Sequence, residues 1–268
     1  MIKLGAVSFM NAKPLTFAIE QGLVEHDFEI TLMPPSELSQ LLQKREIDLG
    51  LIPVAEFLKR GSYSAVPGIS ISSFGKVDSV VLLTKGKIED IKKVAVDRRS
   101  QSSTALLKII LEIFRGISPE YLPRATGGEF LEDVDAGLII GDTGLEKTYA
   151  PPAGYEVHDL GEIWTRETGL PFVYAVFAVN EGVELGRNLD ALYRSKEHGL
   201  GIVGKIAKLE SLRTGVNEGV CRTYLTERIK YGLGEKEIEA IGKYSEYLSR
   251  LGEAEKIARI RLYHNSSD

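Results

Sequence analysis

The chain has 268 residues, of which 43% are hydrophobic and 26% charged, and its formal net charge is −5 at pH 7. This composition is typical of a globular protein that can bury a core, and the negative charge disfavours a nucleic-acid-binding function, which requires a basic surface. Cys221 is the only cysteine, which excludes an internal disulfide and a thiolate zinc cluster. Without an apolar run of about 18 residues or a leader pattern, the sequence predicts a cytoplasmic protein with no membrane segment.

The first part of the chain alternates β-rich runs with amphipathic segments. The expected elements are, in order, strand Ile2–Val7, helix Ala12–Gln21, strand Phe28–Met33, helix Ser36–Lys44 and strand Ile47–Ile52. Strands joined by helices in this way pair in parallel. Open α/β sheets bind their ligands beyond the carboxyl ends of such strands, so polar residues at those ends are the candidates for a site.

Two further β-rich runs, Ile69–Phe74 and Ser79–Thr84, precede a second α/β series. The remaining expected elements are strand Lys93–Val96, helix Ser103–Phe114, strands Ala136–Ile140 and Phe172–Val179, and helices Leu185–His198, Asn217–Ile229 and Glu235–Leu251. Two α/β units connected by extended strands, with a helical end returning to the first unit, are typical of a two-lobed binding protein. A single doubly wound domain is the alternative interpretation.

A glycine-rich segment, Gly199–Lys205, matches both G-x-G-x-x-G and G-x-x-x-x-G-K, the patterns of dinucleotide-binding and phosphate-binding loops. It follows a predicted helix where a strand is required, and Ile206 occupies the position of the Ser or Thr that contacts magnesium. We therefore interpret these glycines as a helix end and a bend. The four histidines are dispersed without metal-ligand spacing, so no metal site is predicted.

Polar clusters follow three of the predicted strands. The first, Ser8–Leu15, contains Asn11, whose amide can both donate and accept hydrogen bonds to a ligand. The second, Asp97–Thr104, places several hydroxyls at a helix N-terminus, where free N–H groups and the helix dipole favour an anion such as a carboxylate. Both clusters could equally serve only to cap their helices.

The third cluster, Ile139–Thr143, contains Gly141, which permits close approach of the backbone, and Asp142, which could cap a helix or accept a hydrogen bond from a ligand hydroxyl. Weaker candidates are Ser79, at the start of a strand, and the segment Ile52–Glu56, where a strand gives way to a short helix. Trp164 is interpreted as a packing anchor.

In their residues and in their order along the chain, these motifs resemble the chorismate dehydratase family of the futalosine route to menaquinone over nearly the whole chain. The matching segments are Gly5–Leu15, Asp48–Glu56, Val77–Val80, Ser100–Leu107, Ile140–Asp142 and Thr168–Val173. The resemblance implies an α/β fold like that of type 2 periplasmic binding proteins, with a ligand cleft between two lobes. The implied first lobe is discontinuous, residues 1–83 with 174–268, and the second is residues 84–173.

The same resemblance implies that the protein is a lyase, which removes water from chorismate, an anionic small molecule, to give 3-[(1-carboxyvinyl)oxy]benzoate. It implies no cofactor, and no nucleic-acid or membrane partner. The implied catalytic residues are Asn11 and Ser79, and the implied substrate-binding residues are Ser8, Pro53, Glu56, Ser102, Ser103, Thr104, Gly141 and Asp142.

This chain departs from the family pattern at two positions. Gln101 occupies a position where the family has Arg, and Phe177 one where Trp is frequent. Loss of that guanidinium removes a bidentate carboxylate contact, for which Arg98 or Arg99 could substitute.

None of the clusters supplies a histidine to act as base. In one hypothesis, the enolpyruvyl carboxylate of the substrate takes the proton from C3, oriented by Asn11 and bound with the help of Ser79. In the other, Glu56 or Asp142 is the general base. Two other functions are considered: the sister enzyme that forms 1,4-dihydroxy-6-naphthoate, which has Pro-Asn-Asp-Thr where this chain has Ala12 after the asparagine, and a non-catalytic cytosolic receptor for an anionic metabolite.

Overall fold

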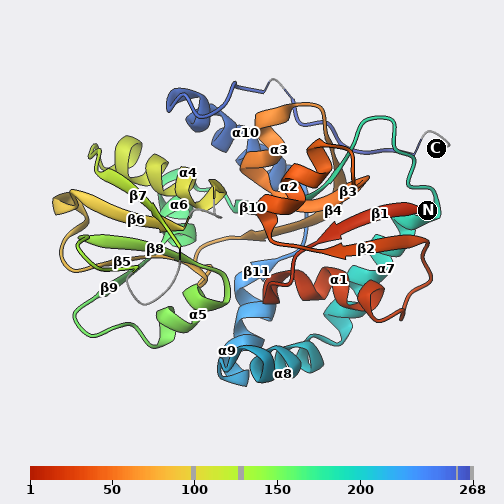
Figure 1. Ribbon diagram of the computed structural model, residues 1–268, viewed down its shortest axis with the longest axis horizontal. Coiled ribbons are helices and arrows are strands. Elements are labelled where there is room, and N and C mark those ends of the chain that lie inside the picture. The colour runs from red at the N-terminus through yellow and green to blue at the C-terminus, as the bar shows by residue number, and fades with distance from the viewer. Residues whose placement is uncertain (98–100, 126–129, 258, 266–268) are drawn as a thin grey trace.

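The computed structural model describes residues 1–97, 101–125, 130–257 and 259–265. It contains two separate β-sheets, each with helices packed against it, and Figure 1 shows them as two lobes side by side. The first sheet consists of β1 (Ile2–Ala6), β2 (Phe28–Leu32), β3 (Leu49–Pro53), β4 (Ser64–Ser73), β10 (Phe172–Val179) and β11 (Ile229–Lys230). The second consists of β5 (Val80–Thr84), β6 (Lys93–Asp97), β7 (Glu120–Arg124), β8 (Ala136–Ile140) and β9 (Glu156–Asp159).

Strand order in the first sheet is β11-β4-β10-β3-β1-β2, and in the second it is β7-β6-β8-β5-β9. Parallel pairs join β1 to β2 and β3, and β6 to β7 and β8. Strand β10 is antiparallel to both β3 and β4, and β5 is antiparallel to β8 and β9. The parallel pairs confirm the βαβ order expected in each half of the chain.

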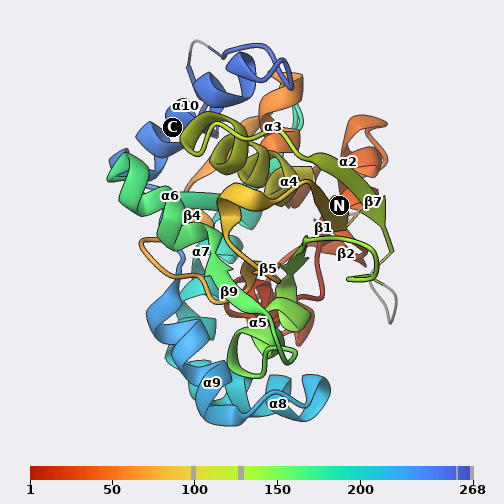
Figure 2. The ribbon, with the colours of Figure 1, turned by 90° about the vertical axis from the view of Figure 1, so that its left-hand side faces the viewer.

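The helices of the first lobe are α1 (Lys13–Glu20), α2 (Pro35–Gln43), α3 (Val54–Arg60), α7 (Arg187–Gly201), α8 (Val203–Thr214), α9 (Glu218–Thr223) and α10 (Glu235–Arg250). Those of the second are α4 (Gln101–Lys108), α5 (Gly141–Tyr149) and α6 (Leu160–Thr168). Short 3-10 helices, η1 (Met10–Ala12) and η2 (Ile88–Asp90), and π-helical turns, η3 (Ile109–Phe114) and η4 (Tyr224–Arg228), complete the described elements. In Figures 1 and 2, α10 lies at one end of the region between the lobes and α8 and α9 at the other.

The chain passes from the first sheet to the second at residues 74–79 and returns between α6 and β10. Strand β5 pairs within the second sheet, so the passage comes before residue 83, the lobe boundary implied by the resemblance. An aromatic cluster packs beside the return: Trp164 is fully buried, its ring edge-on to Phe172 and Tyr244, and its indole N–H donates to the Pro171 carbonyl. The interpretation of this tryptophan as a packing anchor is confirmed.

Several sequence expectations need correction. The helix predicted at Ser103–Phe114 is α-helical only to Lys108 and then π-helical, and the helix predicted at Asn217–Ile229 becomes π-helical at Tyr224. The glycine-rich segment contains the end of α7 and the start of α8. Gly199 lies within α7 where that helix meets α1, and a Cβ there would lie 2.1 Å from the Pro14 carbonyl oxygen. The glycine therefore permits close helix packing, in agreement with a structural role.

Candidate functional site

A cleft of about 730 Å³, measured out to its mouth, lies between the two lobes. The described residues that line it are Val7, Phe9, Asn11, Pro35, Leu51, Pro53, Ile71, Val77, Ser79, Val80, Gln101, Ser102, Ser103, Ile140, Gly141, Tyr174 and Ala175.

The cleft walls come from the ends of strands in both sheets. The turn from β1 to η1 supplies Phe9 and Asn11, and the end of β3 supplies Pro53. From the second lobe come the start of α4 and the junction of β8 with α5. This is the position expected for a ligand in an open α/β sheet, beyond the carboxyl ends of the parallel strands.

Six of the residues predicted for the site line this cleft. They are Asn11, Pro53, Ser79, Ser102, Ser103 and Gly141. The polar positions that follow separate strands in the sequence therefore meet around one cavity.

Three other predicted residues lie elsewhere. Ser8 is exposed and absent from the cleft lining. Glu56 lines a neighbouring polar hollow, where its carboxylate pairs with Lys59 at 3.2 Å. Thr104 lines a different hollow together with Lys108. Ser8 lies in the loop between β1 and η1, and Glu56 lies within α3. Thr104 follows the lining residue Ser103 in α4, and successive residues of a helix point in different directions.

Asp142 is also absent from the cleft lining and instead connects the two lobes. One carboxylate oxygen accepts a hydrogen bond from the Met10 backbone N–H at 3.3 Å, and the other accepts one from Arg213 on α8 at 2.5 Å. Both contacts cross from the second lobe to the first. In this arrangement the carboxylate is occupied by protein donors and fixes the backbone next to Asn11.

The start of α4 is also connected to the first lobe. The Ser102 hydroxyl accepts a hydrogen bond from the Ala55 N–H at 3.0 Å, and the Gln101 side chain accepts one from Lys59 at 2.7 Å. The Ser102 hydroxyl keeps its own hydrogen for a ligand. The proposed substitutes for a family arginine, Arg98 and Arg99, lie outside the described residues, as does Ser100 of the matched motif.

Two tyrosines of the site carried no sequence signal. Tyr174 lines the cleft from β10, and its hydroxyl is 2.9 Å from that of Ser73. Tyr224 lies behind the cleft and donates a hydrogen bond to the Ser79 hydroxyl at 2.8 Å. Burial raises the pKa of the Tyr224 phenol, and hydrogen bonding to Ser79 and Asn11 opposes that rise only in part. Tyr174 lies in an apolar strand and Tyr224 in a mainly polar helical segment, and neither setting indicates a role beyond packing.

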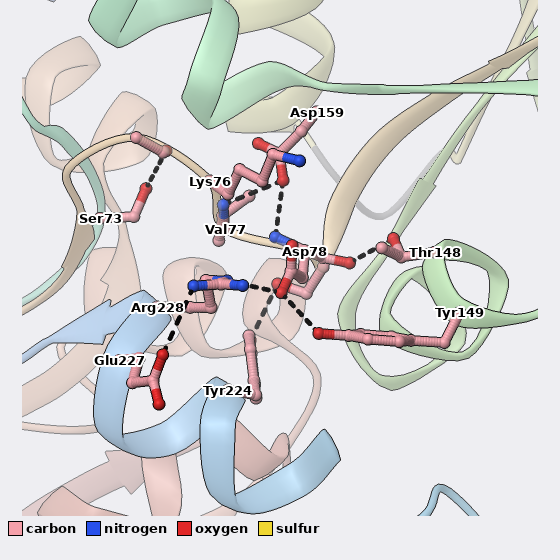
Figure 3. A network of polar contacts seen from close by, with 12 residues as sticks. Ser73, Lys76, Val77, Asp78, Thr148, Tyr149, Asp159, Tyr224, Glu227 and Arg228 are labelled. Atoms are coloured by element: carbon pink, nitrogen blue, oxygen red, sulfur yellow. Dashed lines mark hydrogen bonds and ion pairs between the residues drawn. The ribbon is translucent and has the colours of Figure 1, made fainter. Parts of the chain in front are cut away.

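The backbone leading into Ser79 is held by polar contacts, which Figure 3 shows. Asp78 has φ of 60°, in the left-handed region that favours glycine. Its carboxylate accepts hydrogen bonds from Arg228 at 2.7 Å and from Tyr149 at 3.0 Å. Asp159 accepts from the backbone N–H groups of Val77 and Asp78, at 3.0 and 2.7 Å. Burial raises the pKa of Asp159 to about 6, although these N–H groups favour its charged form.

The described residues of the cleft lining carry no charged side chain. Among its described residues there is no Asp, Glu, His, Lys, Arg or Cys, and the single ionisable group is Tyr174, whose pKa burial raises well above the usual value. Hydroxyl, amide and backbone N–H groups are therefore the polar groups that this described part of the lining offers a ligand. Such donors can bind an anion, but none of them is a base near neutral pH.

The described residues contain no group of three or more His, Cys, Asp or Glu side chains placed to hold a metal ion. Nor do they include a helix long and apolar enough to cross a membrane.

Comparison with known proteins gives a family and a fold. A family described as menaquinone biosynthesis matches residues 2–250. Chorismate dehydratase of Thermus thermophilus is 31% identical over 261 residues, which cover 91% of this chain and 94% of that protein.

Among solved structures, an Archaeoglobus fulgidus protein superposes with a TM-score of 0.74 at 19% identity, over 94% of this chain and 97% of that one. The alkanesulfonate-binding protein of Xanthomonas axonopodis, bound to MOPS, gives 0.71 at 14% identity, over 97% and 96%. At these identities the structures show the fold alone, and that fold is the two-lobed periplasmic-binding-protein-like one.

Proposed function

The chain belongs to the menaquinone biosynthesis family and is an enzyme of that biosynthesis, and from this premise we propose that it is a hydro-lyase that converts chorismate to 3-[(1-carboxyvinyl)oxy]benzoate and water. The Thermus relative is named for this reaction. The cleft between the lobes is the proposed substrate site, and the cytoplasm is the proposed compartment.

The observation that carries this proposal is that the described residues of the cleft lining carry hydrogen-bond donors and no charged side chain. Chorismate has two carboxylates, and both need donors once they leave water. The hydroxyls of Ser79, Ser102 and Ser103 line the cleft, and so does the start of α5 at Gly141, where backbone N–H groups at the positive end of the helix dipole are unpaired. Fixed dipoles of this kind stabilise negative charge in a site that excludes water.

The proposed reaction begins with loss of the proton at C3 of the ring. The electron pair of that C–H bond is conjugated through the ring double bond with the ring carboxylate, on which the negative charge increases. The same electron pair then forms the C3–C4 double bond, while the C4 hydroxyl leaves and is protonated to water. The products are an aromatic ring and one water molecule, so atoms and electrons balance. Aromatisation supplies the driving force, and the enzyme has to lower the barrier to proton loss.

We propose that Ser102 and Ser103, near the N-terminus of α4, bind the ring carboxylate. Both are buried and line the cleft. An ionised carboxylate accepts further charge poorly, so donors oriented toward it before reaction stabilise the transition state more than the ground state.

For the base we propose the enolpyruvyl carboxylate of the substrate itself. The described lining residues provide no ionised carboxylate or imidazole. Of the two alternatives, Glu56 lies in the neighbouring hollow and Asp142 is occupied by Arg213 and a backbone N–H. Asn11 would orient the enolpyruvyl carboxylate and Ser79 would help to bind it. An intramolecular base held in this way gains from proximity.

Incubation of the purified protein with chorismate tests the reaction. We expect an aromatic absorbance to appear and the substrate mass to fall by one water. Chorismate left unchanged but bound would indicate a receptor. Chorismate neither bound nor consumed would indicate the sister naphthoate-forming activity or another substrate.

Three single variants test the assignment of the base. Glu56→Gln and Asp142→Asn should retain turnover near that of the wild type, whereas Asn11→Ala should abolish it. Loss of turnover in either carboxylate variant, with Asn11→Ala active, would show that the base is a protein carboxylate. Circular dichroism of each variant confirms that the fold is retained.

A further inference from the structure

Tyr224 and Ser79 form a buried hydroxyl pair behind the cleft. The phenol donates its hydrogen to the Ser79 oxygen at 2.8 Å. Tyr224 is 2% exposed and is not among the cleft-lining residues, whereas Ser79 is. The phenol therefore acts on a ligand through the lining residues that it contacts, which are Ser79 and the Asn11 amide.

This contact fixes the direction in which Ser79 donates. A serine hydroxyl has one hydrogen and two lone pairs, and it rotates to suit its partners. Because one lone pair already accepts the Tyr224 hydrogen, the serine hydrogen must point elsewhere. The cleft is the open direction, and an anion there would receive it. Burial keeps the phenol protonated, and so a donor, throughout the working pH range.

A second contact from the same π-helical turn fixes the backbone. Arg228 lies one turn after Tyr224 in η4, and its guanidinium donates to Asp78, the residue before Ser79. Figure 3 shows Tyr224 and Arg228 approaching the segment from the same side. Asp78 has a positive φ, which persists only where surrounding contacts hold it.

We propose that η4 is the positioning element for Ser79: Tyr224 orients its hydroxyl toward the cleft, and Arg228 holds its backbone through Asp78. This inference rests on the proposed function for its catalytic consequence, because Ser79 there binds the carboxylate that takes the proton. Tyr224 is thus a positioning residue, and its effect on turnover passes through the serine.

The chain contains a matched control. Tyr231 lies just after η4, is buried like Tyr224, and has a hydroxyl without a hydrogen-bond partner among the described residues. Tyr231→Phe and Tyr224→Phe make the same chemical change in one neighbourhood. They differ in whether the lost hydroxyl was oriented toward a cleft residue.

The experiment is a double-mutant cycle with Ser79→Ala. We expect Tyr224→Phe to lower kcat/KM about tenfold, the effect of one oriented hydrogen bond, and Tyr231→Phe to leave it unchanged. In the Ser79→Ala background, Tyr224→Phe should cause no further loss, because its effect depends on the serine. Losses that multiply in the double variant, or a Tyr224→Phe enzyme as active as the Tyr231→Phe control, would overturn the proposal.

A crystal structure of Tyr224→Phe provides a readout that does not depend on turnover. We expect the Ser79 hydroxyl to occupy more than one rotamer in this variant and a single rotamer in Tyr231→Phe. A single unchanged rotamer in both would refute the positioning role. If the wild type fails to convert chorismate, the proposed function fails while this readout still decides the inference.

Arg228→Gln provides a second variant for the cycle in case Tyr224→Phe does not fold. It removes the other contact of η4, and its loss of kcat/KM should likewise vanish in the Ser79→Ala background. An equal loss in both backgrounds would show that η4 does not act through the serine.

Discussion

Gly144→Ala is the substitution that moves Ser79 most directly, because α5 packs against its backbone. A Cβ at position 144 would lie 2.5 Å from the Ser79 carbonyl oxygen, 3.0 Å from its carbonyl carbon and 3.1 Å from the Ile139 carbonyl oxygen. All three are backbone atoms, which cannot rotate away as a flexible side chain would. Ordinary contact begins at 3.4 Å, so α5 and the Ser79 backbone must separate by 0.9 Å.

The cost of this separation follows from the packing. Overpacking a well-packed site costs about 1–3 kcal/mol, and alanine recovers about 1 kcal/mol because it is the better helix former. The net loss in the free energy of unfolding is therefore between zero and about 2 kcal/mol, which lowers Tm by up to about 8 °C in a chain of this size. Displacement of a binding group by roughly 1 Å costs about 100-fold in rate. We therefore expect a fall of about this size in kcat.

Thermal denaturation and the rate of chorismate consumption measure these two effects. Gly242→Ala is the control, because Gly242 is exposed within α10 and a Cβ there meets nothing within 4 Å. It should raise stability by up to about 1 kcal/mol and leave kcat unchanged. A Gly144→Ala enzyme with the Tm and kcat of the wild type would refute the reasoning that Ser79 is fixed from the side of α5.

Two further predictions concern stability. Because burial raises the pKa of Asp159 from 3.8 to about 6, the folded state binds this proton more tightly than the unfolded chain does. The free energy of unfolding of the wild type should therefore fall by about 2 kcal/mol between pH 4 and pH 7 relative to that of Asp159→Asn. Denaturant titrations that give the two proteins parallel pH profiles would contradict this. Gly199→Ala should lower stability by more than about 1 kcal/mol in the same titrations, since its Cβ meets the Pro14 backbone, while Gly201→Ala, with open space, should not. Equal effects of the two alanines would mean that the close contact between α7 and α1 is not what Gly199 provides.

The strands with strong patterns were predictable from the sequence. Buried runs such as Val80–Thr84 and Phe172–Val179 have a composition that marks them locally. Strands β7 and β9 were missed because they are sheet edges with weak patterns: β7 contains Pro123, and β9 is a four-residue run with a single aliphatic side chain. The π-helical turns were also missed, since a 3.6-residue period does not distinguish them from α-helix.

The cleft was predictable where one strand end supplies several polar groups. Asn11 lies just before a helix that follows a strand, and Ser103 lies in the first turn of another such helix; that local order places both at the edge of a sheet. Tyr224 lies 145 residues from Ser79 in sequence, and only the return of the chain to the first lobe brings them together. No local pattern signals such a pair. The direction in which a side chain points is equally unpredictable from the sequence. The sequence therefore predicts a ligand contact for Asp142, whereas its carboxylate accepts a hydrogen bond from Arg213.

The path of the chain between the sheets sets an order in which the lobes can form during synthesis. Every strand of the second sheet lies within residues 80–159, a continuous stretch that can fold as soon as it has been made. The first sheet needs β10 at its centre, β11 at its edge and the bridge between Ala65 and Leu262. Its first three strands must therefore wait, with an open edge on β3, while more than a hundred further residues are added. The open strand edge is a site for aggregation, so the nascent chain is most vulnerable in this interval.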